Sequence, residues 1–165
     1  MSNLYPVAGA KIWMSTAPVP LPTDDVTAST FSGVTYVEID GWETMGAYGD
    51  SAELITTQLI NRGRDIKQKG TRNAGSMENN FAIVDADPGQ TQLIAAEATR
   101  DNYAFKIEYD DAPASGSAPT PSRDEFIGLV MGAPKQGGGA NTVRMISSTI
   151  EINSNLLFTA AATGD

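Results

Sequence analysis

The 165-residue sequence contains no cysteine and no histidine. Without cysteine the chain has no disulfides and no thiol nucleophile. Without either residue it has no zinc site of the Cys/His kind and no imidazole acid–base catalysis. Carboxylates, lysine and serine are still available, so this composition disfavours an enzyme without excluding one. The sequence predicts a non-enzymatic protein with no catalytic residues, no cofactor and no metal ion.

Basic residues are also scarce, with 11 Lys and Arg against 20 Asp and Glu and a net charge of −9. This acidic excess repels nucleic acid, and it equally suits a conduit that DNA must pass without adhering. No apolar run approaches the length of a membrane span, and the N-terminus lacks the basic and apolar segments of a signal peptide. We therefore expect a protein that is made and kept in a cytoplasm-like compartment and binds no membrane.

Two short patterns that might suggest a ligand have simpler interpretations. The acid pairs Asp24-Asp25, Asp85/Asp87 and Asp110-Asp111 lack the spacing of a calcium-binding EF-hand loop, and they are typical of solvated turns and of a helix N-cap. The run Gly137–Gly139 lacks the phosphate-binding pattern and opens no helix, so it predicts a flexible turn.

The remaining composition favours a globular, mainly β domain spanning residues 1–165. Hydrophobic residues make up 41% and charged residues 19% of the chain, which also has 16 Gly and 9 Pro. Apolar content, alternation and β-branched residues indicate six or seven strands. The expected strand ranges are 10–14, 34–39, 53–60, 76–84, 103–109, 125–133 and 142–152.

One helix is expected, over residues 87–98. Asp87 stands at the N-cap position, Pro88 at the first helical position and Gln90 at the third, as in a capping box. The expected apolar stripe of this helix consists of Leu93, Ile94 and Ala98. Together with the strands, this helix predicts a β-sandwich or small barrel with one short α-helix and long loops.

The basic residues are concentrated in one short segment, which we expect to form part of a long inter-strand loop over residues 61–77. Its five basic residues are Arg62, Arg64, Lys67, Lys69 and Arg72. With Asp65 as its only acid this segment carries +4, while the other residues, six basic and 19 acidic, carry −13. The alternatives are a solvated loop or a nucleic-acid site, but no aromatic residues interleave with these bases. We favour a contact between subunits.

The order of elements resembles that of a known family. The helix start DPGQTQL follows the basic segment and its strand, the strand YAFKIEYDD comes next, and EFIGLVMGAPKQGGGANTVRMISSTIEI lies after a low-complexity loop. Over roughly residues 42–152 the chain is similar to the major tail protein, or tail tube protein, of bacteriophages with long, non-contractile tails.

This resemblance implies a structural virion protein that forms hexameric rings stacked into a tail tube through which DNA is delivered. It implies a location in the virion tail after synthesis in the host bacterial cytoplasm. The implied partners are further copies of the chain and the tape-measure, tail-tip and tail-terminator proteins. The long loop and a terminal arm, over residues 1–9 or in the tail 153–165, would reach the neighbouring ring.

Site residues follow as hypotheses from this resemblance. The inter-ring contact candidates are Arg62, Arg64, Lys67, Lys69, Arg72 and Trp42, the last being equally compatible with a place in the core. The acidic candidates for the lumen are Glu38, Asp40 and Glu78. Two alternatives stay open: the tube of a contractile tail or of a type VI secretion-like machine, and a carbohydrate-binding β-sandwich, which would need a row of exposed aromatics.

Overall fold

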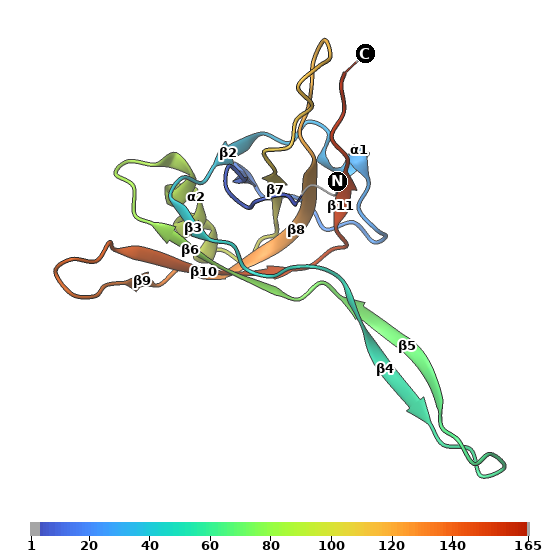
Figure 1. The fold of residues 1–165 in the computed structure, drawn as a ribbon. Helices are drawn as coiled ribbons and strands as arrows, with labels where there is room; N and C mark the ends of the chain where they lie inside the picture. The colour runs from blue at the N-terminus through green and yellow to red at the C-terminus, as the bar shows by residue number, and fades with distance from the viewer. Residues whose placement is uncertain (1–3, 165) are drawn as a thin grey trace.

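The structure, a computed structural model, describes residues 4–164, and within that range the chain forms eleven strands and two helices (Figure 1). The strands are β1 Lys11–Ser15, β2 Tyr36–Glu38, β3 Trp42–Thr44, β4 Ser51–Thr57, β5 Ile66–Asn73, β6 Ser76–Ala82, β7 Tyr103–Glu108, β8 Arg123–Gly132, β9 Lys135–Gln136, β10 Met145–Ile152 and β11 Leu157–Thr159. The helices are α1 Ala28–Phe31 and α2 Pro88–Glu97. The predicted mainly β fold is confirmed, with one short helix more than the sequence indicated.

Nine of these strands form one antiparallel sheet. Seven follow the order β2-β1-β7-β8-β10-β6-β3, while β11 pairs with β8 and β9 pairs with β10. The other two strands, β4 and β5, pair only with each other. The chain is therefore divided into a body built on the large sheet and a separate two-stranded ribbon.

The large sheet curls until its two ends meet. Only residues 39–41 connect β2 with β3, although these strands lie at opposite ends of the strand order. A flat sheet cannot hold its two edge strands so close, so the sheet bends toward a barrel. Two backbone hydrogen bonds lie at this closure, from Ile39 N–H to Ile12 O at 2.9 Å and from Ala82 N–H to Gly41 O at 2.7 Å.

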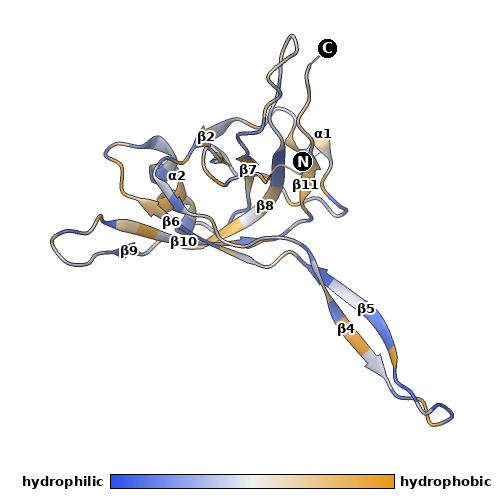
Figure 2. Cartoon of the chain, viewed as in Figure 1, coloured by the Kyte–Doolittle hydropathy of each residue, from blue (hydrophilic) through white to orange (hydrophobic). Residues whose placement is uncertain are grey.

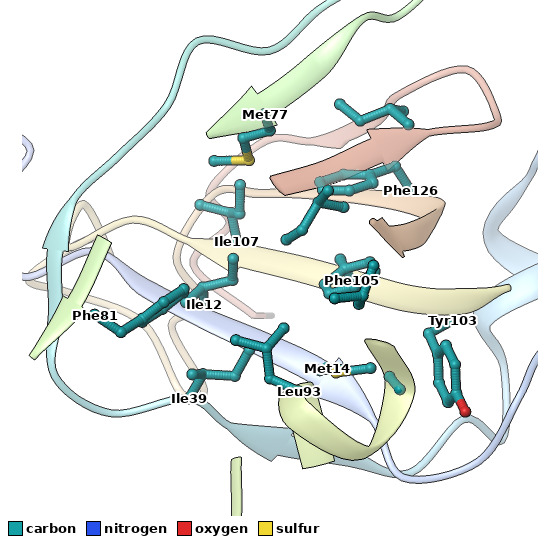
Figure 3. Close-up of a cluster of buried hydrophobic side chains, with 14 of the residues drawn as sticks. Ile12, Met14, Ile39, Met77, Phe81, Leu93, Tyr103, Phe105, Ile107 and Phe126 are labelled. Carbon is teal, nitrogen blue, oxygen red and sulfur yellow. The ribbon is translucent and has the colours of Figure 1, made fainter. Parts of the chain in front are cut away.

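The main hydrophobic core fills the interior of the curled sheet (Figure 3). Its fully buried side chains include Ile12, Met14, Met77, Phe81, Leu93, Phe105, Ile107 and Phe126. The rings of Phe105 and Phe126 are stacked with their centroids 5.5 Å apart, an arrangement that adds to the burial of two large aromatic surfaces. At the end of β6, Phe81 is buried, and Ile83 just after the strand packs against this core.

Strand β7 is buried on both faces. Its alternate residues Tyr103, Phe105 and Ile107 face the main core, whereas Ala104 belongs to a second, smaller cluster with Phe31 of α1. Helix α1 follows the proline-rich part of the chain, and its Phe31 is one of several side chains that cover the outer face of β7 at Ala104.

Helix α2 begins where the sequence predicts, but the side chain of its third residue, Gln90, does not make the predicted capping-box contact. The Asp87 Oδ2 atom accepts a hydrogen bond from Gln90 N–H at 2.7 Å, as expected of an N-cap. The Gln90 side chain does not complete a capping box; its amide instead donates to the carbonyl oxygens of Asp40 at 2.8 Å and Ala82 at 2.7 Å. Gln90 thus ties together the two ends of the sheet, which is why it is buried.

Other details differ from the sequence-based expectations. The buried residues of α2 include Leu93 and Ala96, whereas Ile94 is exposed, so the predicted stripe was wrong at two positions. Most of the segment expected as a loop, 61–77, is strand β5 and the start of β6. The segment predicted as a C-terminal tail, 153–165, contains β11, and residue 165 lies outside the described range. Of the N-terminal arm predicted over 1–9, residues 4–9 are exposed and the rest lie outside that range.

Candidate assembly interface

Strands β4 and β5 form a long hairpin that projects away from the body (Figure 1). We call residues 51–73 the arm. Every residue of β4 is exposed, and in β5 only Ile66 and Gly70 are partly buried. A two-stranded hairpin is marginally stable by itself in water, because neither face is covered by other strands. Within the described residues the arm is therefore held mainly by the pairing of its own two strands.

The two faces of the arm differ in chemistry. Directly opposed residues of an antiparallel pair share a face, so Leu54 lies beside Lys69 on one side and Ile55 beside Gln68 on the other. Leu54 is 62% exposed and Ile55 is 46% exposed. Ile60, in the connection between the strands, is fully exposed. Figure 2 shows apolar stretches, coloured orange, on β4 and β5 between hydrophilic and intermediate ones.

The basic residues predicted to make an inter-ring contact all lie on this arm. Lys67, Lys69 and Arg72 belong to β5, while Arg62 and Arg64 lie in the connection between the strands. Only Arg72 has an ionic partner among residues 4–164, Asp50 at 3.6 Å, and this pair is near the base of the arm. The other four cations have no acidic partner within the described chain; two lie in the connection at the tip and two along β5.

Sequence reasoning missed the apolar part of the arm. It expected Glu53–Ile60 to be a strand, and a strand with Leu54, Ile55 and Leu59 normally turns such residues toward a core. The structure gives this strand no core to face. One sequence signal could have shown that this strand lacks a core. The segment that follows it is rich in charged residues and glycine, so it has no apolar face that could cover Leu54 or Ile55.

The chain enters the arm through a loop fixed to the body. Asn79 Oδ1 accepts hydrogen bonds from Trp42 Nε1 and from Gly46 N–H, both at 3.1 Å. A Cβ atom on Gly46 would lie 2.2 Å from the carbonyl oxygen of Glu78, so only glycine permits this close approach to β6. The route from β3 to the arm is therefore held by strand β6.

A half-buried tyrosine pair also holds this loop. The Tyr48 hydroxyl contacts the Tyr109 hydroxyl and donates to Asp124 Oδ2 at 2.7 Å, and Tyr109 donates to the same oxygen at 3.2 Å. Burial, together with the neighbouring hydroxyl and the Asp124 carboxylate, raises the pKa of Tyr48. Burial and Asp124 likewise raise the pKa of Tyr109. Both phenols therefore stay protonated and act as donors.

Trp42, the sixth inter-ring candidate, lies on β3 at the side of the body. Its ring is stacked on Phe81 with the centroids 6.5 Å apart, and its indole N–H is bonded to Asn79. The side chain is half-buried. Its contacts within the described chain are those of a residue that packs on the core, and its place in an inter-ring contact remains a prediction.

The three acids predicted to line a lumen lie in different places. Glu38 is on β2, with its carboxylate 3.5 Å from Lys11 Nζ, and Asp40 is in the turn that follows. Glu78 is on β6, next to the other end of the strand order, opposite Thr149 of β10. Glu151 shares that outward face of β10 with Thr149 and accepts a hydrogen bond from Ser76. The structure therefore groups Glu78 with Glu151 and not with Glu38 or Asp40.

The described residues include neither a metal-binding cluster nor a membrane-spanning helix. Within residues 4–164 no three acidic side chains come together in a way that would hold a metal ion. No helix in the described part of the chain has the length and hydropathy needed to cross a membrane.

The fold has clear counterparts among solved structures. A chain in the cryo-EM structure of the anti-feeding prophage baseplate, symmetrised six-fold, superposes with a TM-score of 0.65 at 11% identity, over 97% of this chain and 98% of that one. A chain in the sheath-tube complex of an extracellular contractile injection system, in its extended state, gives 0.65 at 9% identity, over 95% and 92%. A chain in the tail of an empty GTA particle, refined with C6 symmetry, gives 0.54 at 16% identity, over 82% and 93%.

At these identities the likeness establishes a shared fold. No protein-family model and no curated protein matches the sequence.

Proposed function

We propose that this chain is the tube subunit of a phage-like tail or injection machine, and that copies of it assemble into stacked rings around a continuous channel. The observation that carries the proposal is the arm, a hairpin with exposed apolar residues and unpaired cations, on a body with the fold of chains from tail and injection assemblies. In this role the protein is structural and has no catalytic function.

The contact that we assign to the arm is between rings. Its five basic residues form a +4 segment on a chain of net charge −9, so a neighbouring copy offers a surface of opposite sign. The arm and the surface that receives it are different parts of the chain. A contact of that kind is heterologous, and repeated along an axis it builds an open filament. Six copies per ring is the number we propose, in line with the symmetry of the neighbouring assemblies.

The proposed tube subunit could belong to a contractile or to a non-contractile assembly. The sequence resembles tubes of long, non-contractile phage tails, whereas two of the structural neighbours come from the anti-feeding prophage and from a contractile injection system. The TM-score of 0.65 with a chain of the extracellular contractile injection system supports the contractile alternative at the level of fold. A gene for a sheath protein beside this one, or a sheath protein that binds the assembled tubes, would decide for a contractile machine.

For the channel wall we propose the outward face of β6 and β10, centred on Glu78, with Glu151 at the border of this face next to the base of the arm. A wall with acids and without cations repels a polyanion, so DNA would pass without adhering. The proposed partners are further copies of the chain, together with tape-measure, tail-tip and tail-terminator proteins. The proposed location is the tail of the particle, after synthesis in the bacterial cytoplasm.

Electron microscopy of the purified protein over a range of concentrations and salt levels tests this function. Hollow tubes or rings of uniform diameter are the expected result. A variant with residues 52–72 replaced by two glycines is the matched control, which should fold and stay monomeric. Uniform monomers of the unaltered chain in all conditions, also with tail-tip proteins added as a nucleus, would reject the proposal. A glycan screen would then test the carbohydrate-binding alternative.

A further inference from the structure

A groove lies at the base of the arm, between the arm and the body. Its volume is about 990 Å³, and segments 21–25, 71–74 and 151–155 line it together with Asp50. We propose that this groove receives the tip of the arm of a second copy in the next ring. The inference rests on the proposed function and deepens it, because it names the surface that accepts the arm.

The groove is acidic where the arm is basic. Asp24 and Asp25 stand exposed on one wall, and among residues 4–164 neither carboxylate has an ionic partner. Asp50, also in the lining, is already paired with Arg72. At the arm tip Arg62 and Arg64 are equally without partners. The described chain therefore carries two acidic residues in the groove and two basic residues at the arm tip that lack ionic partners. A contact between the tip of one copy and the groove of another would pair them.

The acidic wall is held in position by the body. Val26 N–H donates to Asn155 Oδ1 at 2.7 Å, and Asn155 Nδ2 donates back to Val26 O at 3.4 Å. This pair fastens the segment carrying Asp24 and Asp25 to the chain that follows β10. The carboxylates are thus presented by a backbone fixed at its end, which reduces the entropy lost when a partner binds.

The rim of the groove and the tip of the arm also match in their apolar residues. Leu21 is 43% exposed and lies beside Pro22 in the lining. At the tip Leu59 is 38% exposed and Ile60 is fully exposed. Contact between these residues would remove apolar surface from water on both sides, in addition to the ionic contacts.

The tip cannot occupy the groove of its own chain. Thr71 and Arg72 at the base of the arm line that groove. Strand β4 has seven residues, so at about 3.3 Å per residue the paired strands hold the tip roughly 20 Å or more away. Only another copy can fill the groove, and each copy both gives and receives an arm.

Cysteine cross-linking tests this contact directly, because the natural chain has no cysteine. In the double variant Arg62→Cys/Asp25→Cys, an added oxidant should join assembled subunits through disulfides. The expected product is a ladder that extends well beyond six subunits on a non-reducing gel, since contacts between rings run along the tube. The matched control is Arg62→Cys/Glu97→Cys, with the second cysteine on the exposed face of α2, which should give no ladder.

The other outcomes overturn the assignment in separable ways. Tubes that form without cross-linking place the receiving surface elsewhere and leave the tube function standing. A ladder that stops at six places the contact within a ring. Cross-linked monomers place the tip in its own groove. Absence of tubes from the unaltered chain, with and without a tail-tip nucleus, would instead count against the proposed function itself.

Charge exchange gives a second test that needs no cross-link. Reversing the groove with Asp24→Lys/Asp25→Lys, or the tip with Arg62→Glu/Arg64→Glu, should raise the concentration needed for assembly about tenfold or more. The combined quadruple variant should recover most of that loss. Equal defects in the single-surface and combined variants would refute the pairing.

Discussion

At the scale of single residues, closure of the body depends on Gln90. It is buried, and its amide bridges Asp40 and Ala82 from the two ends of the sheet while its oxygen accepts from Val84 N–H at 3.3 Å. The sequence placed Gln90 correctly in the first turn of α2, but its partners lie as far as fifty residues away in the chain, so no local pattern could identify them.

Replacing Gln90 with leucine should destabilise the body strongly. Gln90→Leu leaves two carbonyls and one N–H without partners near the core, and we expect a loss of about 2–4 kcal/mol in the free energy of unfolding. Urea unfolding of the unassembled protein measures it. Gln92→Leu on the same helix is the control, with a loss below about 1 kcal/mol, because its amide bonds partly exposed carbonyls. Equal losses would contradict this account of closure.

Tyr48 provides a prediction with a pH dependence. Tyr48→Phe removes the donor to the Asp124 carboxylate and should cost about 1–3 kcal/mol at neutral pH. Because folding raises the pKa of this phenol, its contribution is complete below the ordinary tyrosine pKa of about 10 and is lost as the pH rises toward the folded-state value. The unaltered protein should therefore lose stability above about pH 10 more steeply than the variant.

Chemical unfolding at a series of pH values checks this difference. The matched control is Tyr5→Phe, because Tyr5 is 78% exposed. That substitution should change neither the stability nor its pH dependence. Parallel curves for the unaltered protein and Tyr48→Phe would show that the half-buried tyrosine pair does not hold the arm's entry loop in the way we describe.

At the scale of elements, the sequence predicted best those helices and strands that are specified by neighbouring residues in the chain. Helix α2 has an N-cap residue and a proline at its start, and β7 and β10 have regularly alternating apolar residues. The predicted ranges of these three elements therefore nearly coincide with those in the structure. Strand β5 was missed because IKQKGTRN has weak strand propensity and no apolar face. It is a strand only because β4 pairs with it. Strand β11 likewise exists only through its long-range pairing with β8.

The arm's apolar residues should matter for assembly and not for folding. Leu54→Ser/Ile55→Ser changes residues that face solvent in the subunit, so we expect the free energy of unfolding to change by less than about 0.5 kcal/mol per site. The concentration needed for tube formation should nevertheless rise. Sedimentation velocity and thermal unfolding measure the two quantities. A stability loss with normal assembly would contradict the role of the arm.

At the scale of the whole molecule, charge is divided between the arm and the body. The arm holds most of the unpaired cations, and the body carries the acidic excess that makes the chain −9 overall. Composition already showed this division, since the +4 segment could be located from sequence alone. The sequence could not show that Glu78 and Glu151 share one outward face while Glu38 and Asp40 lie elsewhere, because that depends on the strand order.

Reversing one wall charge should make the channel retain DNA. Glu78→Lys leaves the core untouched, because the side chain is exposed on β6, so tubes should still form. They should bind a fluorescent oligonucleotide at low salt and release it as the salt concentration rises. The measurement is co-sedimentation of the oligonucleotide with tubes. Glu97→Lys on α2 is the control, with the same added charge, and equal retention by both variants would remove Glu78 from the channel wall.

The exposed two-stranded arm has a consequence for the time course of amide hydrogen exchange. Its N–H groups are protected only by pairing between β4 and β5, and such a ribbon opens far more often than the body sheet. In the subunit, the arm amides should therefore exchange orders of magnitude faster than those of β7 or β10. Docking would suppress this opening, so protection would spread into the arm when copies join. The exchange rate of the arm amides would then distinguish free subunits from assembled ones.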